Sequence, residues 1–124
     1  PWWGTTTVKS NDGISVEEQE NDPNSLLNTY KALIKLRKDN AVLINGGYES
    51  IPNQSKDIVS FYRENEKDKV LVLINLSSEK EELELSIEIG EPNLIFGEKN
   101  GTFKNKKLSI ELPAYGTQVW KIIP

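Results

Sequence analysis

Residues 70–76 read Val-Leu-Val-Leu-Ile-Asn-Leu, a run in which odd and even positions are both apolar up to Ile74. Successive side chains of a strand point to opposite faces of its sheet, so a strand over these residues has two apolar faces. We expect one face to meet a second sheet and the other to meet a further buried surface. The run therefore predicts the central strand of a layered β structure.

The residues after this run alternate in polarity. Residues 82–89 place four aliphatic side chains on one face and polar groups on the other, and residues 107–112 repeat the scheme, which is typical of half-exposed antiparallel strands. Asn100-Gly101 is a two-residue hairpin signal. Seven or eight short strands at this spacing predict a mainly β, antiparallel, Greek-key-like sandwich. The further predicted strands cover residues 47–51, 58–64, 94–96, 102–103 and 118–123.

The chain before Ala41 has a different pattern. Residues 1–22 lack helical and strand periodicity and predict an extended loop. Asp22 as a cap and Pro23 at the first helical position predict one α-helix over residues 23–38. Its main apolar stripe also contains Arg37, and Ala32 and Leu36 fall on another side, so we expect the helix to pack between two layers. The stripe consists of Leu26, Leu27, Tyr30, Leu33 and Ile34.

Composition excludes several functions. The 124 residues contain no His and no Cys, which removes Ser-His and Cys-His catalysis, thiolate metal sites and disulfides. Fifteen basic and nineteen acidic residues are interspersed, so no basic face is available for nucleic acid. No apolar run approaches the length of a membrane helix. We predict no metal, no cofactor, no nucleic-acid partner and no membrane partner.

Three stretches resemble the C-terminal region of glycoside hydrolase family 13, the α-amylase, oligo-glucosidase and neopullulanase group. Pro1-Trp2-Trp3 resembles the end of a late barrel loop, and residues 25–38 are similar to the last helix of the catalytic barrel. Gly46-Gly47-Tyr48, residues 70–76 and residues 112–120 (Leu-Pro-Ala-Tyr-Gly-Thr-Gln-Val-Trp) resemble the C-terminal β-sandwich. Their order and spacing cover nearly the whole chain.

The resemblance implies residues 1–40 as the tail of a catalytic (β/α)8 barrel and residues 41–124 as a C-terminal sandwich domain. It also implies a parent enzyme that acts on α-glucans by a retaining mechanism, which needs two carboxyl groups about 5 Å apart. The family's catalytic carboxylates lie upstream of Pro1, so we expect no catalytic residue in this chain. The parent's own barrel is the expected partner, and an α-glucan is a second candidate. The opening at Pro1 without an initiator Met favours a piece of a longer protein, and the compartment stays open.

The candidate site residues fall into a possible sugar-contact pair, two turns and a set of interface residues. Trp2 and Trp3 could stack on sugar rings, although packing is the commoner role of tryptophan. Tyr115 is expected to anchor a turn through its hydroxyl, and Asn11-Asp12-Gly13 reads as a plain turn. The candidates for a domain interface are Leu26, Tyr30, Leu33, Ile34, Arg37 and Trp120, the last of which also fits a core position.

Three functions remain open at this point. The favoured one is a non-catalytic domain that packs against and stabilises the catalytic barrel. The second is a carbohydrate-binding module for starch or maltooligosaccharides, suggested by the three tryptophans. The third is an unrelated interaction sandwich, in which the preceding helix would have no obvious purpose.

Overall fold

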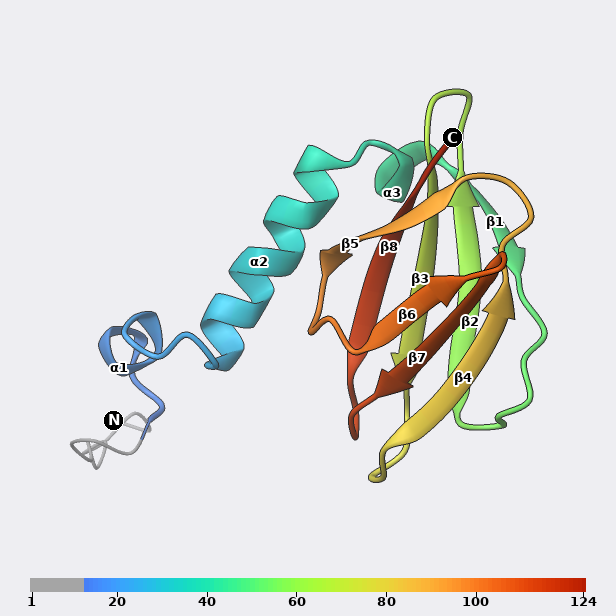
Figure 1. The fold of residues 1–124 in the computed structure, drawn as a ribbon. Helices are drawn as coiled ribbons and strands as arrows, with labels where there is room; N and C mark the ends of the chain where they lie inside the picture. The colour runs from blue at the N-terminus through green and yellow to red at the C-terminus, as the bar shows by residue number, and fades with distance from the viewer. Residues whose placement is uncertain (1–12) are drawn as a thin grey trace, which may run out of the picture. The chain divides into compact units, whose positions relative to one another are not determined.

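A computed structural model describes residues 13–124 (Figure 1). The chain divides between Lys35 and Leu36 into two compact units. This division falls inside the long helix, slightly before the boundary at residues 40/41 that the sequence suggested. Among the described residues, no helix is both long enough and apolar enough to cross a membrane.

The first unit contains a short helix that the sequence did not predict. Helix α1 spans Val16–Glu20 within the stretch expected to be a loop. Ser15 and Glu18 form a capping box, in which the Ser15 hydroxyl accepts from the Glu18 N–H and the Glu18 carboxylate accepts from the Ser15 N–H. This reciprocal pair satisfies amide groups that five residues of helix could not otherwise satisfy.

Helix α2 spans Leu26–Asp39, close to the predicted 23–38. Its start differs from the prediction, because the Ser25 hydroxyl accepts from the Asn28 N–H at 3.2 Å and so acts as the cap. Asp22 instead accepts from the Asn24 N–H at 2.9 Å in the turn before the helix. A second short helix that was not predicted, α3 at Val42–Asn45, follows α2.

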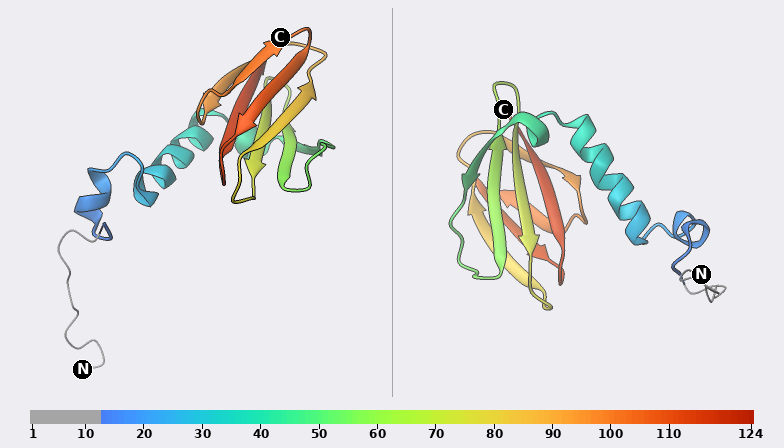
Figure 2. Two further views of the ribbon diagram at one scale, coloured as in Figure 1. Left: turned by 60° about the horizontal axis from the view of Figure 1, so that its bottom comes forward. Right: turned by 180° about the vertical axis from the view of Figure 1, so that it is seen from behind.

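The second unit is a β-sandwich of eight strands in two antiparallel sheets (Figures 1 and 2). The larger sheet has the order β1-β2-β3-β8-β5 and the smaller sheet has the order β4-β7-β6. This arrangement confirms the predicted mainly β antiparallel sandwich. The strands are β1 Gly47–Ser50, β2 Ile58–Glu64, β3 Lys69–Asn75, β4 Glu81–Ser86, β5 Glu91–Phe96, β6 Gly101–Lys104, β7 Lys107–Leu112 and β8 Thr117–Ile123.

The main hydrophobic core lies between the two sheets. The alternating strands β4 and β7 supply their aliphatic positions to it, as the sequence pattern predicted, and Ile87 follows them into the core. The predicted strand over residues 82–89 is too long, because β4 ends at Ser86 and the fourth aliphatic side chain, Ile89, is 81% exposed. Trp120 also belongs to this core, where its indole N–H donates to Gln118 Oε1 at 3.0 Å and Gln118 donates in turn to the Glu98 carbonyl at 2.8 Å. The buried members are Ile58, Leu71, Leu73, Leu83, Leu85, Ile87, Leu108, Ile110, Leu112, Trp120 and Ile122.

The hairpin prediction at Asn100-Gly101 is wrong. β5 pairs with β8 in the larger sheet and β6 pairs with β7 in the smaller sheet, so the chain changes sheets at residues 97–100. The hairpin turn is instead at Asn105-Lys106, where both residues have positive φ, +52° and +62°. Two consecutive residues with positive φ are the requirement of a type I′ turn, and asparagine tolerates this conformation.

Candidate functional site

The larger sheet has a second apolar surface, on the side away from the smaller sheet. The alternation of β3 sends Leu71 and Leu73 into the core between the sheets and Val70 and Val72 to this opposite side. We call this surface the outer face. Its buried residues are Val42, Val70, Val72 and Val119, and the partly buried residues packed with them are Leu36, Leu43, Phe61, Ile74, Ile95 and Phe96. The two-sided strand predicted from residues 70–76 is thereby confirmed.

Helix α3 covers one end of the outer face (Figure 2). Val42 of this helix is fully buried against the sheet. Arg63 fixes the chain that follows, because its guanidinium donates to the Gly46 carbonyl at 2.8 Å and to the Gly47 carbonyl at 3.1 Å. A side chain at Gly46 would place Cβ 2.4 Å from the Val42 carbonyl oxygen. The attachment of α3 to the sheet is therefore tight and specific.

Within residues 36–124, part of the outer face is uncovered. Val59 on β2 is 36% exposed, and Ile74 on β3 is only partly buried. Tyr48 on β1 is 65% exposed and stacks on Phe61 with ring centroids 4.9 Å apart. The outward positions of β2, β3 and β8 include Arg63 and Lys121 but no carboxylate, although the chain carries nineteen. Such a surface suits burial against another apolar layer.

The outer face ends at a corner between β7 and β8. Tyr115 lies there with φ +55°, a left-handed conformation that costs a residue with a side chain roughly 1–2 kcal/mol. Its N–H donates to the Ser77 carbonyl at 3.0 Å, while the ring is 69% exposed. The expectation that the tyrosine anchors a turn through its hydroxyl is therefore corrected, since the backbone makes the anchoring bond.

The predicted interface residues fall into two places. Leu26, Tyr30 and Ile34 of α2 are each more than half exposed, Leu33 is 39% exposed, and Arg37 is exposed as well. No residue of α2 is buried by the described part of the chain. Trp120 is 4% exposed and packs between the two sheets, so it belongs to the core rather than to a surface for another domain. Trp2, Trp3 and the Asn11-Asp12 part of the expected turn lie outside the described residues.

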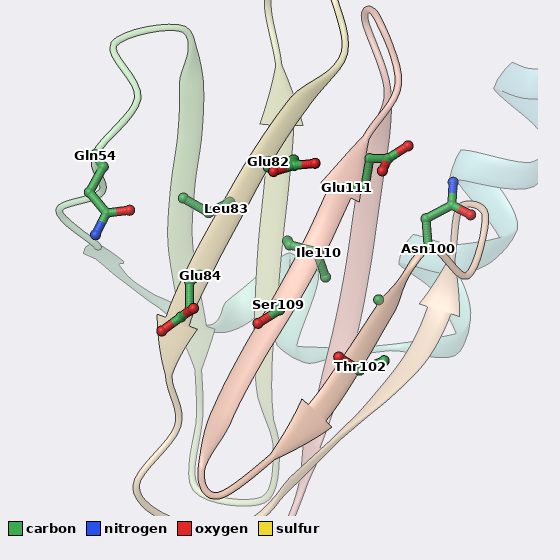
Figure 3. Close-up of a pocket in the computed structure, with 10 residues that line it drawn as sticks. Gln54, Glu82, Leu83, Glu84, Asn100, Thr102, Ser109, Ile110 and Glu111 are labelled. Atoms are coloured by element: carbon green, nitrogen blue, oxygen red, sulfur yellow. The ribbon is translucent and has the colours of Figure 1, made fainter.

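The smaller sheet presents a polar groove to solvent (Figure 3). Glu82 and Glu111 lie directly opposite each other on β4 and β7. Glu111 pairs with Lys80 at 3.3 Å and Glu84 pairs with Lys107 at 3.2 Å. The lining contains no aromatic ring on which a sugar could stack, and no group of three metal-ligating side chains occurs among residues 13–124. The lining residues are Gln54, Glu82, Leu83, Glu84, Asn100, Gly101, Thr102, Ser109, Ile110 and Glu111.

One ionisable group at the edge of the sandwich is perturbed. Burial raises the pKa of the Tyr62 hydroxyl, and the negative charge of Glu49 on the neighbouring strand raises it further. Lys69 Nζ lies 4.2 Å from the centre of the same ring. This arrangement holds the phenol protonated and packed, which is a structural role.

Sequence reasoning missed α3 and the exposure of Tyr115. The Val-Leu-Ile run at residues 42–44 was a signal for a buried turn of helix, but four residues are too few to show helical periodicity. A tyrosine two residues after Pro113 and directly before a glycine was a turn signal, and nothing in it distinguished a packed ring from an exposed one.

Comparisons with known proteins agree with this architecture. The family described as the α-amylase SusG C-terminal domain matches residues 58–119. Alpha-amylase 3 of Dictyoglomus thermophilum is 34% identical over 110 residues, which is 89% of this chain and 21% of that protein. Oligo-1,6-glucosidase of Bacillus cereus is 30% identical over 128 residues, 98% of this chain and 22% of the relative.

Among solved structures, an α-amylase from H. orenii superposes with a TM-score of 0.76 at 35% identity, over 90% of this chain and 23% of the other. The fold and these matches define a mainly β C-terminal domain of the α-amylase class. The chain belongs to the α-amylase SusG C-terminal domain family. It spans about a fifth of the length of the curated relatives that it matches.

Proposed function

We propose that this chain is the non-catalytic C-terminal domain of a retaining, α-glucan-acting glycoside hydrolase and stabilises the catalytic barrel by packing against it. The observation that carries the proposal is the second apolar face of the five-stranded sheet, which within residues 36–124 is covered only in part, by α3 and Leu36. Inter-domain contacts of this kind bury about 600–1,500 Å². Apolar area removed from water contributes roughly 25 cal/mol per Å², so such a contact is a substantial stabilising term.

The exposed apolar residues of helix α2 also support the proposal. A helix with Leu26, Tyr30 and Ile34 exposed leaves apolar area in water unless another layer covers it. We propose that residues 1–40 complete the barrel, with α2 as its last helix, and that residues 41–124 form the attached domain. Under this proposal, Leu33 and Arg37 also lie at the contact with the barrel.

The chemistry of the described residues supports a non-catalytic role for this segment. The retaining mechanism requires one carboxylate nucleophile and one carboxylic acid about 5 Å apart in a shielded cleft. Glu82 and Glu111 are neighbours, but they stand on an open sheet face, and Lys80 pairs with Glu111. We expect the 124-residue chain to show no hydrolysis of maltoheptaose, and the full-length polypeptide to show it. Turnover by the purified chain alone would refute the proposal.

A charge on the uncovered part of the outer face tests the packing directly. Val59→Glu should change the unfolding free energy of the 124-residue chain by less than about 1 kcal/mol, because the position is partly exposed. In the full-length polypeptide the same carboxylate would be buried without a partner, and we expect a lower Tm and a shorter half-life of activity on heating.

The matched control is Thr102→Glu, which adds the same charge to an exposed strand position on the smaller sheet. It should lower the Tm of both proteins slightly and by the same amount, because Glu82 and Glu111 line the same groove in both. Equal effects of Val59→Glu and Thr102→Glu on the full-length protein would mean that the outer face is not the contact surface.

A further inference from the structure

The corner between β7 and β8 holds Tyr115 in its left-handed conformation by several independent bonds. The Tyr115 N–H donates to the Ser77 carbonyl at 3.0 Å, and the Gly116 N–H donates to the Pro113 carbonyl at 2.8 Å. The buried Asn75 donates its backbone N–H to the Gly116 carbonyl at 2.9 Å and its side-chain amide to the Pro113 carbonyl at 3.1 Å. The backbone geometry of Tyr115 is therefore imposed by its surroundings.

The Tyr115 side chain is mostly exposed, so it packs too little against the sandwich to offset the strain of its conformation. Glycine takes a φ of +55° without strain, whereas tyrosine does not. Packing would offset the strain if the residue were buried, but Tyr115 is 69% exposed. A strained residue with an exposed aromatic side chain is a feature of binding surfaces rather than of cores.

Leu76 adds a second exposed apolar side chain to the same corner. It stands between Asn75 and Ser77, the two residues whose main chains bond to residues 115–116, and it is 61% exposed. It also continues the outward alternation of Val72 and Ile74 on β3. The corner thus extends the outer face at the end remote from α3, which lies beside Glu64 and the start of β3.

We propose that Leu76 and Tyr115 form an anchor that inserts into the catalytic domain of the same polypeptide and fixes one end of the contact; this inference rests on the proposed function. The occupant follows from two observations. The chain is a C-terminal domain that spans about a fifth of its curated relatives, so most of such a polypeptide lies outside it. The anchor is also continuous with the uncovered part of the outer face, at Val59 and Ile74.

The proposal predicts opposite effects of one substitution in two contexts. Tyr115→Gly removes the strain, so it should raise the Tm of the 124-residue chain by about 2–8 °C. In the full-length polypeptide the same change removes an aromatic anchor, and the Tm should fall. The measurement is differential scanning calorimetry of both proteins, with and without the substitution.

A second variant and a control keep the test decisive. Leu76→Ser involves no backbone strain, so it should leave the Tm of the 124-residue chain unchanged and lower that of the full-length protein. Ile89→Ser changes a side chain that is 81% exposed in the connection between β4 and β5, and it should be neutral in both.

The outcomes separate this inference from the proposed function. If Val59→Glu destabilises the full-length protein while Tyr115→Gly and Leu76→Ser do not, the anchor is wrong and the packing stands. If none of the three destabilises it, the proposed function fails as well. A lower Tm of the 124-residue chain with Tyr115→Gly would show that the ring supports the sandwich itself, which also overturns the anchor.

Discussion

The two sheets of the sandwich differ in what they present on the side away from each other. The smaller sheet turns Glu82, Glu84 and Ser109 to water, whereas the larger sheet turns Val59, Phe61 and Ile74 outward. A sheet with one polar and one apolar face needs only one partner layer to bury its apolar side chains. The larger sheet has two apolar faces, and α3 covers only part of the second. Under the proposed function, the catalytic barrel packs on the side of the sandwich where this second apolar face lies.

The largest expected effect concerns the hydrophobic core between the two sheets. Leu73 is fully buried between them, so Leu73→Ala should leave a cavity and lower the unfolding free energy of the 124-residue chain by about 2–5 kcal/mol. Urea denaturation followed by circular dichroism measures this change. A loss below about 1 kcal/mol would mean that the core between the sheets is loosely packed.

A smaller effect is expected at high pH from the edge of the same core. The pKa of Tyr62 is raised in the folded protein, so the folded state favours the protonated phenol. The stabilisation is complete below the unfolded pKa, about 10, and is lost as pH rises from there through the folded pKa. Tyr62→Phe should remove this part of the decline in Tm above pH 10. Parallel pH profiles of the two proteins would contradict the assignment.

The polar face of the smaller sheet should respond only weakly to a change of charge. Glu82 stands opposite Glu111, and like charges in this position repel. Glu82→Lys should therefore raise the stability of the 124-residue chain by about 0.2–1 kcal/mol at low salt. The gain should vanish at about 1 M NaCl, where screening is nearly complete. A gain that persists at high salt would point to packing instead of charge.

No measurable effect is expected from sugar at the polar groove, because its lining offers no aromatic ring. Isothermal titration of the 124-residue chain with maltoheptaose should give no saturable heat. Saturable heat that disappears with Trp2→Ala and Trp3→Ala would instead favour the carbohydrate-binding alternative and would place the binding at those tryptophans.

The sequence predicted the strands well because alternation records burial directly. Residues 58–64 and 107–112 match β2 and β7, and the run at residues 70–76 differs from β3 by one position at each end. For the same reason, the sequence predicted the two apolar faces of β3 correctly. Local pattern and tertiary burial agree at these positions.

The predictions from the sequence fail where a local pattern competes with contacts to residues that are distant in the chain. Asn100-Gly101 has the composition of a hairpin turn, yet β5 pairs with β8 and β6 pairs with β7 in the other sheet. Helices α1 and α3 are too short for their periodicity to be seen. The exposure of Tyr115 depends on bonds from Asn75 and Ser77, which are far away in sequence.

The position of β8 has a consequence for biosynthesis. Although β8 follows every other strand in the chain, it lies between β3 and β5 in the larger sheet. Until residues 117–123 have left the ribosome, β5 has no neighbour in that sheet, and neither Val119 nor Trp120 is present to complete the two cores. A product of premature termination therefore exposes apolar strands to chaperones and proteases, and the outer face is complete only after translation has passed β8.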